Sequence, residues 1–120
     1  MRKIESDIIK TVRAIATSGG SGTVKLSTRD VVEYDTTPAG LVLITVRLHG
    51  NVIATMTPGN GYMCIFSRHY QTATTKSRLN CLLQAFTQAR LYQHDFAWYV
   101  SHLDGNTEPF AEGMALRAQF

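Results

Sequence analysis

Short apolar runs separated by tight turns fill the chain between residues 23 and 67, and this alternation limits the possible folds more than any other feature. The strongest run, Leu41 to Leu48, is followed by His49-Gly50-Asn51, in which glycine and asparagine tolerate the positive φ angles of a tight hairpin. Residues 52–56 then form a return strand, and residues 62–67 form another strand after a second turn. Short strands joined by short turns predict an antiparallel meander.

Two segments show the three- and four-residue spacing of amphipathic helices, namely residues 5–17 and residues 75–88. Thr74 or Thr75 is the expected N-cap of the second helix. Residues 90–102 fit either a continued helix or a hairpin that turns near residues 94–95. We expect strands because aromatic and β-branched residues favour them, and we expect the rest of 90–116 to be a last strand or a loose tail.

These elements predict one α+β domain over residues 1–120, with an antiparallel sheet, an N-terminal helix and one central helix. The longest apolar run, residues 41–46, has the length of a buried strand, so we expect no membrane partner.

Charge is segregated along the chain. Residues 1–35 carry six basic and five acidic groups, and the 59 residues from 36 to 94 carry five basic groups and no Asp or Glu. Residues 95–120 carry four acidic groups against Arg117 alone, so the C-terminal end is acidic. An even spread would place about four acids in the central segment, and their absence there favours an anionic partner such as nucleic acid.

The sequence gives little support for catalysis. The four histidines form no HxxH or HExxH pair, and Cys64 and Cys81 belong to no CxxC motif. The central segment has no carboxylate to orient a histidine or to hold a divalent metal. We therefore expect no enzyme, no cofactor and no metal site, and we interpret both cysteines as core residues.

Single strands of nucleic acid are held by aromatic rings that stack on bases and by cations that follow phosphates. Tyr62, Phe66 and Arg68 would share one face of a regular strand, although Phe66 is equally well explained as a core residue. Arg47 and His49 end a neighbouring strand, and a polar stretch connects Arg68 to the cations of the central helix. The candidate binding residues are Arg47, His49, Tyr62, Phe66, Arg68, Tyr70, Lys76 and Arg78.

Four segments carry a resemblance: VRLHGNVI at 46–53, YQTATTKSRLN at 70–80, WYV at 98–100 and PFAEGM at 109–114. In this order they resemble a widespread group of small tailed-phage proteins with the pattern VxLHxxxI, TxTTKxRxN, WxV and FxxGM. Within that group, the chain is similar to the single-stranded-DNA-binding RNA polymerase cofactor of schitoviruses.

The resemblance implies phage origin, a location in the host cytoplasm, action with a phage RNA polymerase and a fold that is not an OB barrel. A Trp that often precedes TxTTK in the group is absent here, and Tyr70 stands near its place. The motif residues have either a binding or a structural role; they are Leu48, His49, Ile53, Thr74, Thr75, Lys76, Arg78 and Asn80.

The first functional hypothesis is a phage single-stranded-DNA-binding protein that acts as a transcription or replication cofactor with weak sequence preference. Such a small domain offers a short footprint, so we expect a homo-oligomer. The acidic end is expected either to contact a polymerase or to lie over the binding site and compete with DNA. The alternative is a protein–protein adaptor, or host-takeover protein, that binds no nucleic acid.

Overall fold

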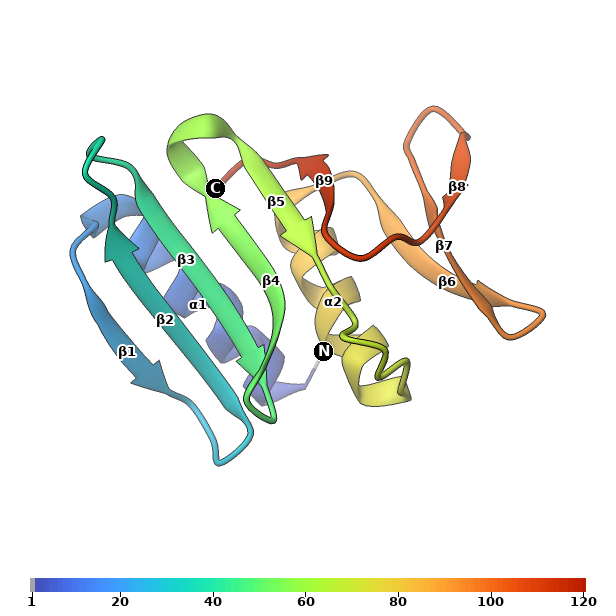
Figure 1. The fold of residues 1–120 in the computed structure, drawn as a ribbon, viewed down its shortest axis with the longest axis horizontal. Helices are drawn as coiled ribbons and strands as arrows, with labels where there is room; N and C mark the ends of the chain where they lie inside the picture. Colours follow the sequence, from blue (N-terminus) through green and yellow to red (C-terminus); the bar gives the residue numbers. More distant parts are fainter. Residues whose placement is uncertain (1) are drawn as a thin grey trace.

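The computed structural model describes residues 2–120 and confirms the predicted fold class, with two helices and antiparallel sheets that do not close into a barrel (Figure 1). The elements in chain order are α1 (Lys3–Ser18), β1 (Gly22–Lys25), β2 (Asp30–Thr36), β3 (Val42–Leu48), β4 (Asn51–Thr57), the 3-10 turn η1 (Pro58–Asn60), β5 (Tyr62–Ile65), α2 (Ala73–Phe86), β6 (Arg90–His94), β7 (Ala97–Ser101), β8 (Thr107–Pro109) and β9 (Met114–Arg117).

The strands form two antiparallel sheets. The larger sheet has the order β1-β2-β3-β4-β5-β9, and the smaller sheet has the order β6-β7-β8. Each strand from β1 to β4 pairs with the next strand along the chain, which confirms the predicted meander. The sequence left the end of the chain undecided, and the structure places it as β9 beside β5.

Both helices cover the same face of the six-stranded sheet (Figure 1). The strand registers align Val32, Val46, Ala54 and Ile65 in one row, and all four are buried on that face. Successive side chains of a strand point to opposite faces of the sheet. The neighbours of these four residues along each regular strand therefore point to the other face, which no helix covers.

Helix α2 begins two residues earlier than the sequence predicts. Thr72 is its N-cap, and its side-chain oxygen accepts a hydrogen bond from the backbone N–H of Thr75 at 3.1 Å. The expectation that Thr74 or Thr75 caps the helix is therefore wrong. Residues 90–101 form the predicted hairpin, turning at Asp95 and Phe96, rather than a continued helix.

The turn between β3 and β4 adopts left-handed angles at His49 (φ 53°) and Gly50 (φ 79°), as expected of a two-residue hairpin. Just beyond it, Arg47 pairs with Val52 while Val46 pairs with Ala54, so Ile53 is the extra residue of a β-bulge. The bulge turns Ile53 and Ala54 to the buried side together.

The side chain of Asn80 joins α2 to the smaller sheet. Its amide nitrogen donates to the carbonyl of Leu91 at 2.8 Å, and its carbonyl accepts from the N–H of Leu91 at 2.8 Å. The amide thus pairs with the edge of β6 as a neighbouring strand would, and this is a structural role for the asparagine of the TxTTKxRxN segment.

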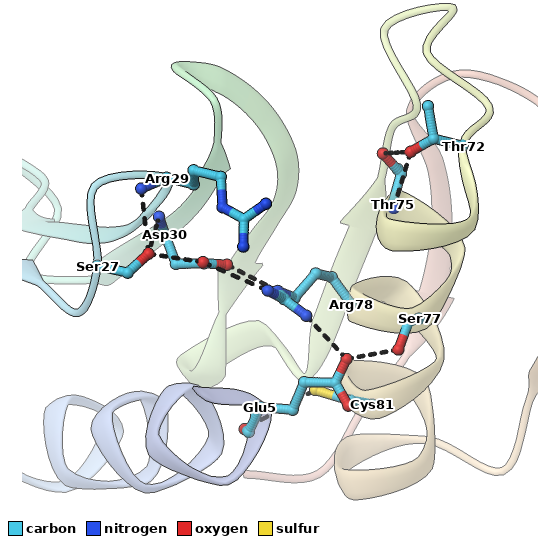
Figure 2. Close-up of polar contacts among 9 residues, drawn as sticks. All are labelled: Glu5, Ser27, Arg29, Asp30, Thr72, Thr75, Ser77, Arg78 and Cys81. Carbon is cyan, nitrogen blue, oxygen red and sulfur yellow. Dashed lines mark hydrogen bonds and ion pairs between the residues drawn. The ribbon is translucent and has the colours of Figure 1, made fainter. Parts of the chain in front are cut away.

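A buried ionic cluster joins α1, α2 and the start of β2 (Figure 2). The guanidinium of Arg78, only 2% exposed, donates to Glu5 at 3.0 Å and to Asp30 at 2.7 Å. Burial raises the pKa of Asp30, but hydrogen bonds from Arg78 and Ser27 outweigh it, so the pKa lies below its usual value. All three charges are compensated inside the fold.

The two cysteines are free thiols in different surroundings. Cys81 is buried in the core as predicted, and burial raises its pKa to about 12. Cys64 is half-buried and lies on the sheet face that no helix covers, because its neighbours Met63 and Ile65 fill the core.

We expect the change Arg78→Met to lower the free energy of unfolding by about 3–5 kcal/mol, because it leaves two buried carboxylates without a cation. Urea unfolding followed by circular dichroism measures this loss. Lys76→Met on the same helix is the matched control, with an expected change of about 0.5 kcal/mol. Equal stability of the two variants would contradict a structural role for the cluster.

Candidate nucleic-acid interface

A pocket of about 460 Å³ opens where the turn between β3 and β4 meets the start of α2. Its walls come from the ends of β3 and β4, from the loop after β5 and from the first turn of α2. The lining residues are Leu48, His49, Asn51, Ile53, Ser67, Tyr70, Thr72, Thr74 and Thr75. None of these is a carboxylate, and they include both the LHxxxI and the TxTT segments of the sequence pattern.

The hairpin turn and the bulge shape one wall of the pocket. The turn carries His49 to the pocket rim, and the backbone N–H of His49 donates to the carbonyl of Arg29 at 2.8 Å. This bond ties the exposed Arg29, in the loop between β1 and β2, to the same end of the sheet. The bulge supplies Ile53 as an apolar patch in the wall.

The threonines of the opposite wall belong to the first turn of α2. Thr72 and Thr75 bond to each other through their hydroxyls at 3.0 Å, in addition to the cap bond (Figure 2). Lys76 follows directly and is half-buried. A helix start with hydroxyls and a lysine is compatible with an anion, because the helix dipole is positive there.

The loop from Ser67 to Tyr70 forms the third wall and has an unusual backbone. Arg68 (φ 53°) and His69 (φ 65°) both lie in the left-handed region, although neither is glycine. Non-glycine residues adopt these angles at a cost of about 1–2 kcal/mol each, so the loop needs compensating contacts.

The carboxylate of Glu112 supplies those contacts. It accepts hydrogen bonds from the N–H of Ser67 at 2.7 Å, from the hydroxyl of Ser67 at 2.6 Å and from the N–H of His69 at 3.1 Å. Burial raises the pKa of Glu112, but these hydrogen bonds outweigh it and hold the pKa below its usual value. Successive backbone N–H groups that converge on an anion form a nest, and Glu112 occupies this one.

Four of the predicted binding residues lie in or beside the pocket. His49 and Tyr70 line it, and Tyr70 is 61% exposed. Arg68 is exposed on the third wall, and Lys76 follows the Thr75 wall. Phe66 is half-buried beneath the guanidinium of Arg68, whose carbon lies 4.8 Å from the ring centre, so its ring is partly covered rather than free for stacking.

The other predicted residues do not join this group. Arg78 is enclosed in the ionic cluster, and this burial argues against a phosphate contact. Arg47 forms an ion pair with Glu33 on the sheet face that the helices leave open. Tyr62 lies on that open face too, and the guanidinium carbon of Arg117 lies 5.7 Å from the centre of its ring.

Sequence reasoning missed several residues of the site. Thr72 carries a recognisable signal, because threonine is a favoured N-cap residue and Thr72 directly precedes the first residue of α2. Arg29 and Glu112 lie outside the acid-free segment, and only the folded chain brings them to this end of the sheet.

Within residues 2–120, no helix is long and apolar enough to cross a membrane. In the same part of the chain, no three His, Cys, Asp or Glu side chains are grouped closely enough to hold a metal ion.

Residues 1–117 match the model of a family described as Kyanoviridae Gp96 protein. No curated protein and no solved structure matches the chain.

We expect Glu112→Gln to lower the free energy of unfolding by about 1–2 kcal/mol at neutral pH, because hydrogen bonds to a charged group are the stronger ones. The pKa of Glu112 is depressed in the fold, so its contribution is present above the ordinary carboxyl pKa and is lost as the pH falls through the depressed value. The gap between wild type and variant should therefore shrink in acid. Urea unfolding at neutral and acidic pH measures both effects. Glu108→Gln on β8 serves as the control with a smaller expected change, because the contact of its carboxylate with His102 is largely exposed.

Proposed function

We propose that this chain, which belongs to the Kyanoviridae Gp96 family of tailed-phage proteins, is a non-catalytic single-stranded-DNA-binding protein that assists phage transcription or replication. It would act inside the host cell beside a phage RNA polymerase. The pocket between the β3–β4 turn and α2 is the proposed interface.

The observation that carries the proposal is the charge around this pocket. His49 lines the pocket, and Arg29, Arg68 and Lys76 lie on three further segments that border it. Of the nearby carboxylates, Glu5 and Asp30 are buried against Arg78, and the exposed Glu112 is engaged by backbone N–H groups. Arg29 and Arg68 are exposed cations beside a pocket whose lining holds no carboxylate, and such cations attract a phosphate backbone.

Tyr70 gives the interface its preference for single strands. Its ring is exposed at the pocket rim, beside the hydroxyls of Thr72 and Thr74. An unpaired base can stack on such a ring, whereas a base inside a duplex is already stacked on its neighbours. In this arrangement Arg68 and Lys76 contact phosphates while Tyr70 holds a base, and the affinity depends little on sequence.

We expect a labelled single-stranded oligonucleotide to bind more tightly than the same sequence as a duplex, with an affinity that falls steeply as salt rises. Fluorescence anisotropy at two salt concentrations measures this. Arg68→Glu and Lys76→Glu should each weaken binding and lower the salt slope by about 0.7. Lys10→Glu, on the exposed side of α1, is the matched charge control. Absence of binding at low salt would reject the proposal in favour of the protein adaptor.

A pair of tyrosines tests the stacking role separately. Tyr70→Ala should weaken single-strand binding by about 1–3 kcal/mol, because a stacked base is lost. Tyr62→Ala should leave the affinity unchanged, because Tyr62 lies on the open sheet face beside Arg117. A loss in Tyr62→Ala alone would move the interface to the sheet face, and no loss in either variant would leave a purely electrostatic surface.

A further inference from the structure

The loop after β5 already binds an anion in this structure, and the chain itself supplies that anion. The N–H and hydroxyl of Ser67 and the N–H of His69, which we call the nest, donate to the carboxylate of Glu112 at 2.7, 2.6 and 3.1 Å. Glu112 lies 45 positions after Ser67, so the contact is a tertiary one. The bound carboxylate shows which chemistry the nest recognises, namely a negative group with acceptor oxygens.

The nest is a formed site with a buried donor. Ser67 is only 2% exposed, and its hydroxyl oxygen also accepts a hydrogen bond from the N–H of His69 at 3.2 Å. The left-handed angles of Arg68 and His69 belong to the turn that brings these donors together. The donors therefore keep one arrangement, which suits a single anionic group.

The guanidinium of Arg68 is left over when Glu112 fills the nest. Arg68 is exposed, and among residues 2–120 its guanidinium takes part in no ion pair. The oxygens of a phosphate point to the corners of a tetrahedron, so one phosphate can accept from the nest and from a guanidinium beside it. Arginine and phosphate form strong charge-assisted hydrogen bonds. The nest and Arg68 together therefore suit a phosphate better than the carboxylate that is bound.

The nest borders the proposed interface. Ser67 and Tyr70, at the two ends of the loop, both line the pocket between the β3–β4 turn and α2. A phosphate bound in the nest therefore belongs to the same surface as the exposed ring of Tyr70, on which a base would stack.

The turn that carries Glu112 is fixed through its backbone, whereas the Glu112 residue is exposed. The N–H of Gly113 donates to the carbonyl of Ile65 at 2.8 Å. The ring of Phe66 lies 3.2 Å from the place that a Cβ on Gly113 would take, so the turn packs closely there. Rotation of the Glu112 side chain is therefore enough to empty the nest, without movement of the turn.

We propose that the nest and Arg68 form a phosphate-binding site, and that Glu112 occupies this site as an internal competitor until a phosphate of single-stranded DNA displaces it. The DNA as the source of the phosphate rests on the proposed function, whereas the site itself does not. The competing role that the sequence suggests for the acidic end is thereby assigned to one carboxylate.

The exchange replaces one anion by another. A carboxylate and a phosphodiester each carry one negative charge at neutral pH, so the nest loses one set of charge-assisted bonds and gains a similar set. Arg68 adds a bond for the phosphate alone. A competitor that fills a site for about nine-tenths of the time weakens the ligand about tenfold, and we expect a competition of this order.

The site is tested first with inorganic phosphate, by thermal unfolding of the full chain in phosphate and in chloride of equal ionic strength. At about five times its Kd, phosphate should raise the Tm of Glu112→Ala by about 4 °C more than that of the wild type or of Glu108→Ala. Adding Arg68→Ala to the Glu112→Ala protein should reduce this extra rise. An equal rise in all the proteins would overturn the proposal.

The competition is tested with a short labelled single-stranded oligonucleotide. Glu112→Ala should bind it about tenfold more tightly than the wild type, although the variant is less stable. Glu108→Ala removes the same charge from β8 and should gain about twofold or less. Glu112→Gln keeps the size of the side chain with a weaker acceptor, so its gain should lie between the two.

The sign of the change separates competition from support. A Glu112 that only stabilises the loop predicts weaker DNA binding in Glu112→Ala, and this result, or a gain no larger than that of Glu108→Ala, would overturn the competition and leave the proposed function standing. If no protein binds DNA, the proposed function is wrong, and the phosphate measurement alone decides whether the nest is an anion site.

Discussion

The buried salt bridges of Arg78 fix the relative positions of α1, α2 and the start of β2. Glu5 comes from the first helix and Asp30 from the start of β2, so a single guanidinium fixes α1, the β1–β2 loop and α2 relative to one another. Desolvated charges are stable only with such partners, and this requirement limits how α2 can sit on the sheet. The first turn of α2 is thereby held opposite the hairpin turn at His49, and the pocket is the space between them.

The proposed interface also depends on left-handed backbone conformations, which residues other than glycine adopt only with strain. His49, Arg68 and His69 all adopt left-handed angles next to the pocket, and the last two rely on the carboxylate of Glu112. Glu112 is therefore the residue through which the acidic end of the chain contacts the candidate site, and it stabilises the loop from Ser67 to Tyr70 there.

Much of the fold could be predicted from local patterns in the sequence. The meander, both helices and the hairpin at residues 90–101 follow from side-chain period and turn chemistry, which act over a few residues. The charge pattern was a poorer guide to the site. The segment 36–94 has no acid of its own, yet Glu33 and Glu112 reach it from either side, and Asp30 joins Arg78 across 48 positions. Pairings over such separations depend on the folded chain, so Arg78 could not be recognised as buried from sequence alone.

The amide of Asn80 has a consequence for how this chain meets other molecules. A strand at the edge of a sheet normally offers free backbone groups to any extended segment nearby, which is a common route to aggregation. Here both backbone groups of Leu91 are already taken by a side chain. Strand addition is closed at this position of β6, so a partner that meets the edge at Leu91 must use side chains, which can discriminate between partners where a bare peptide edge cannot.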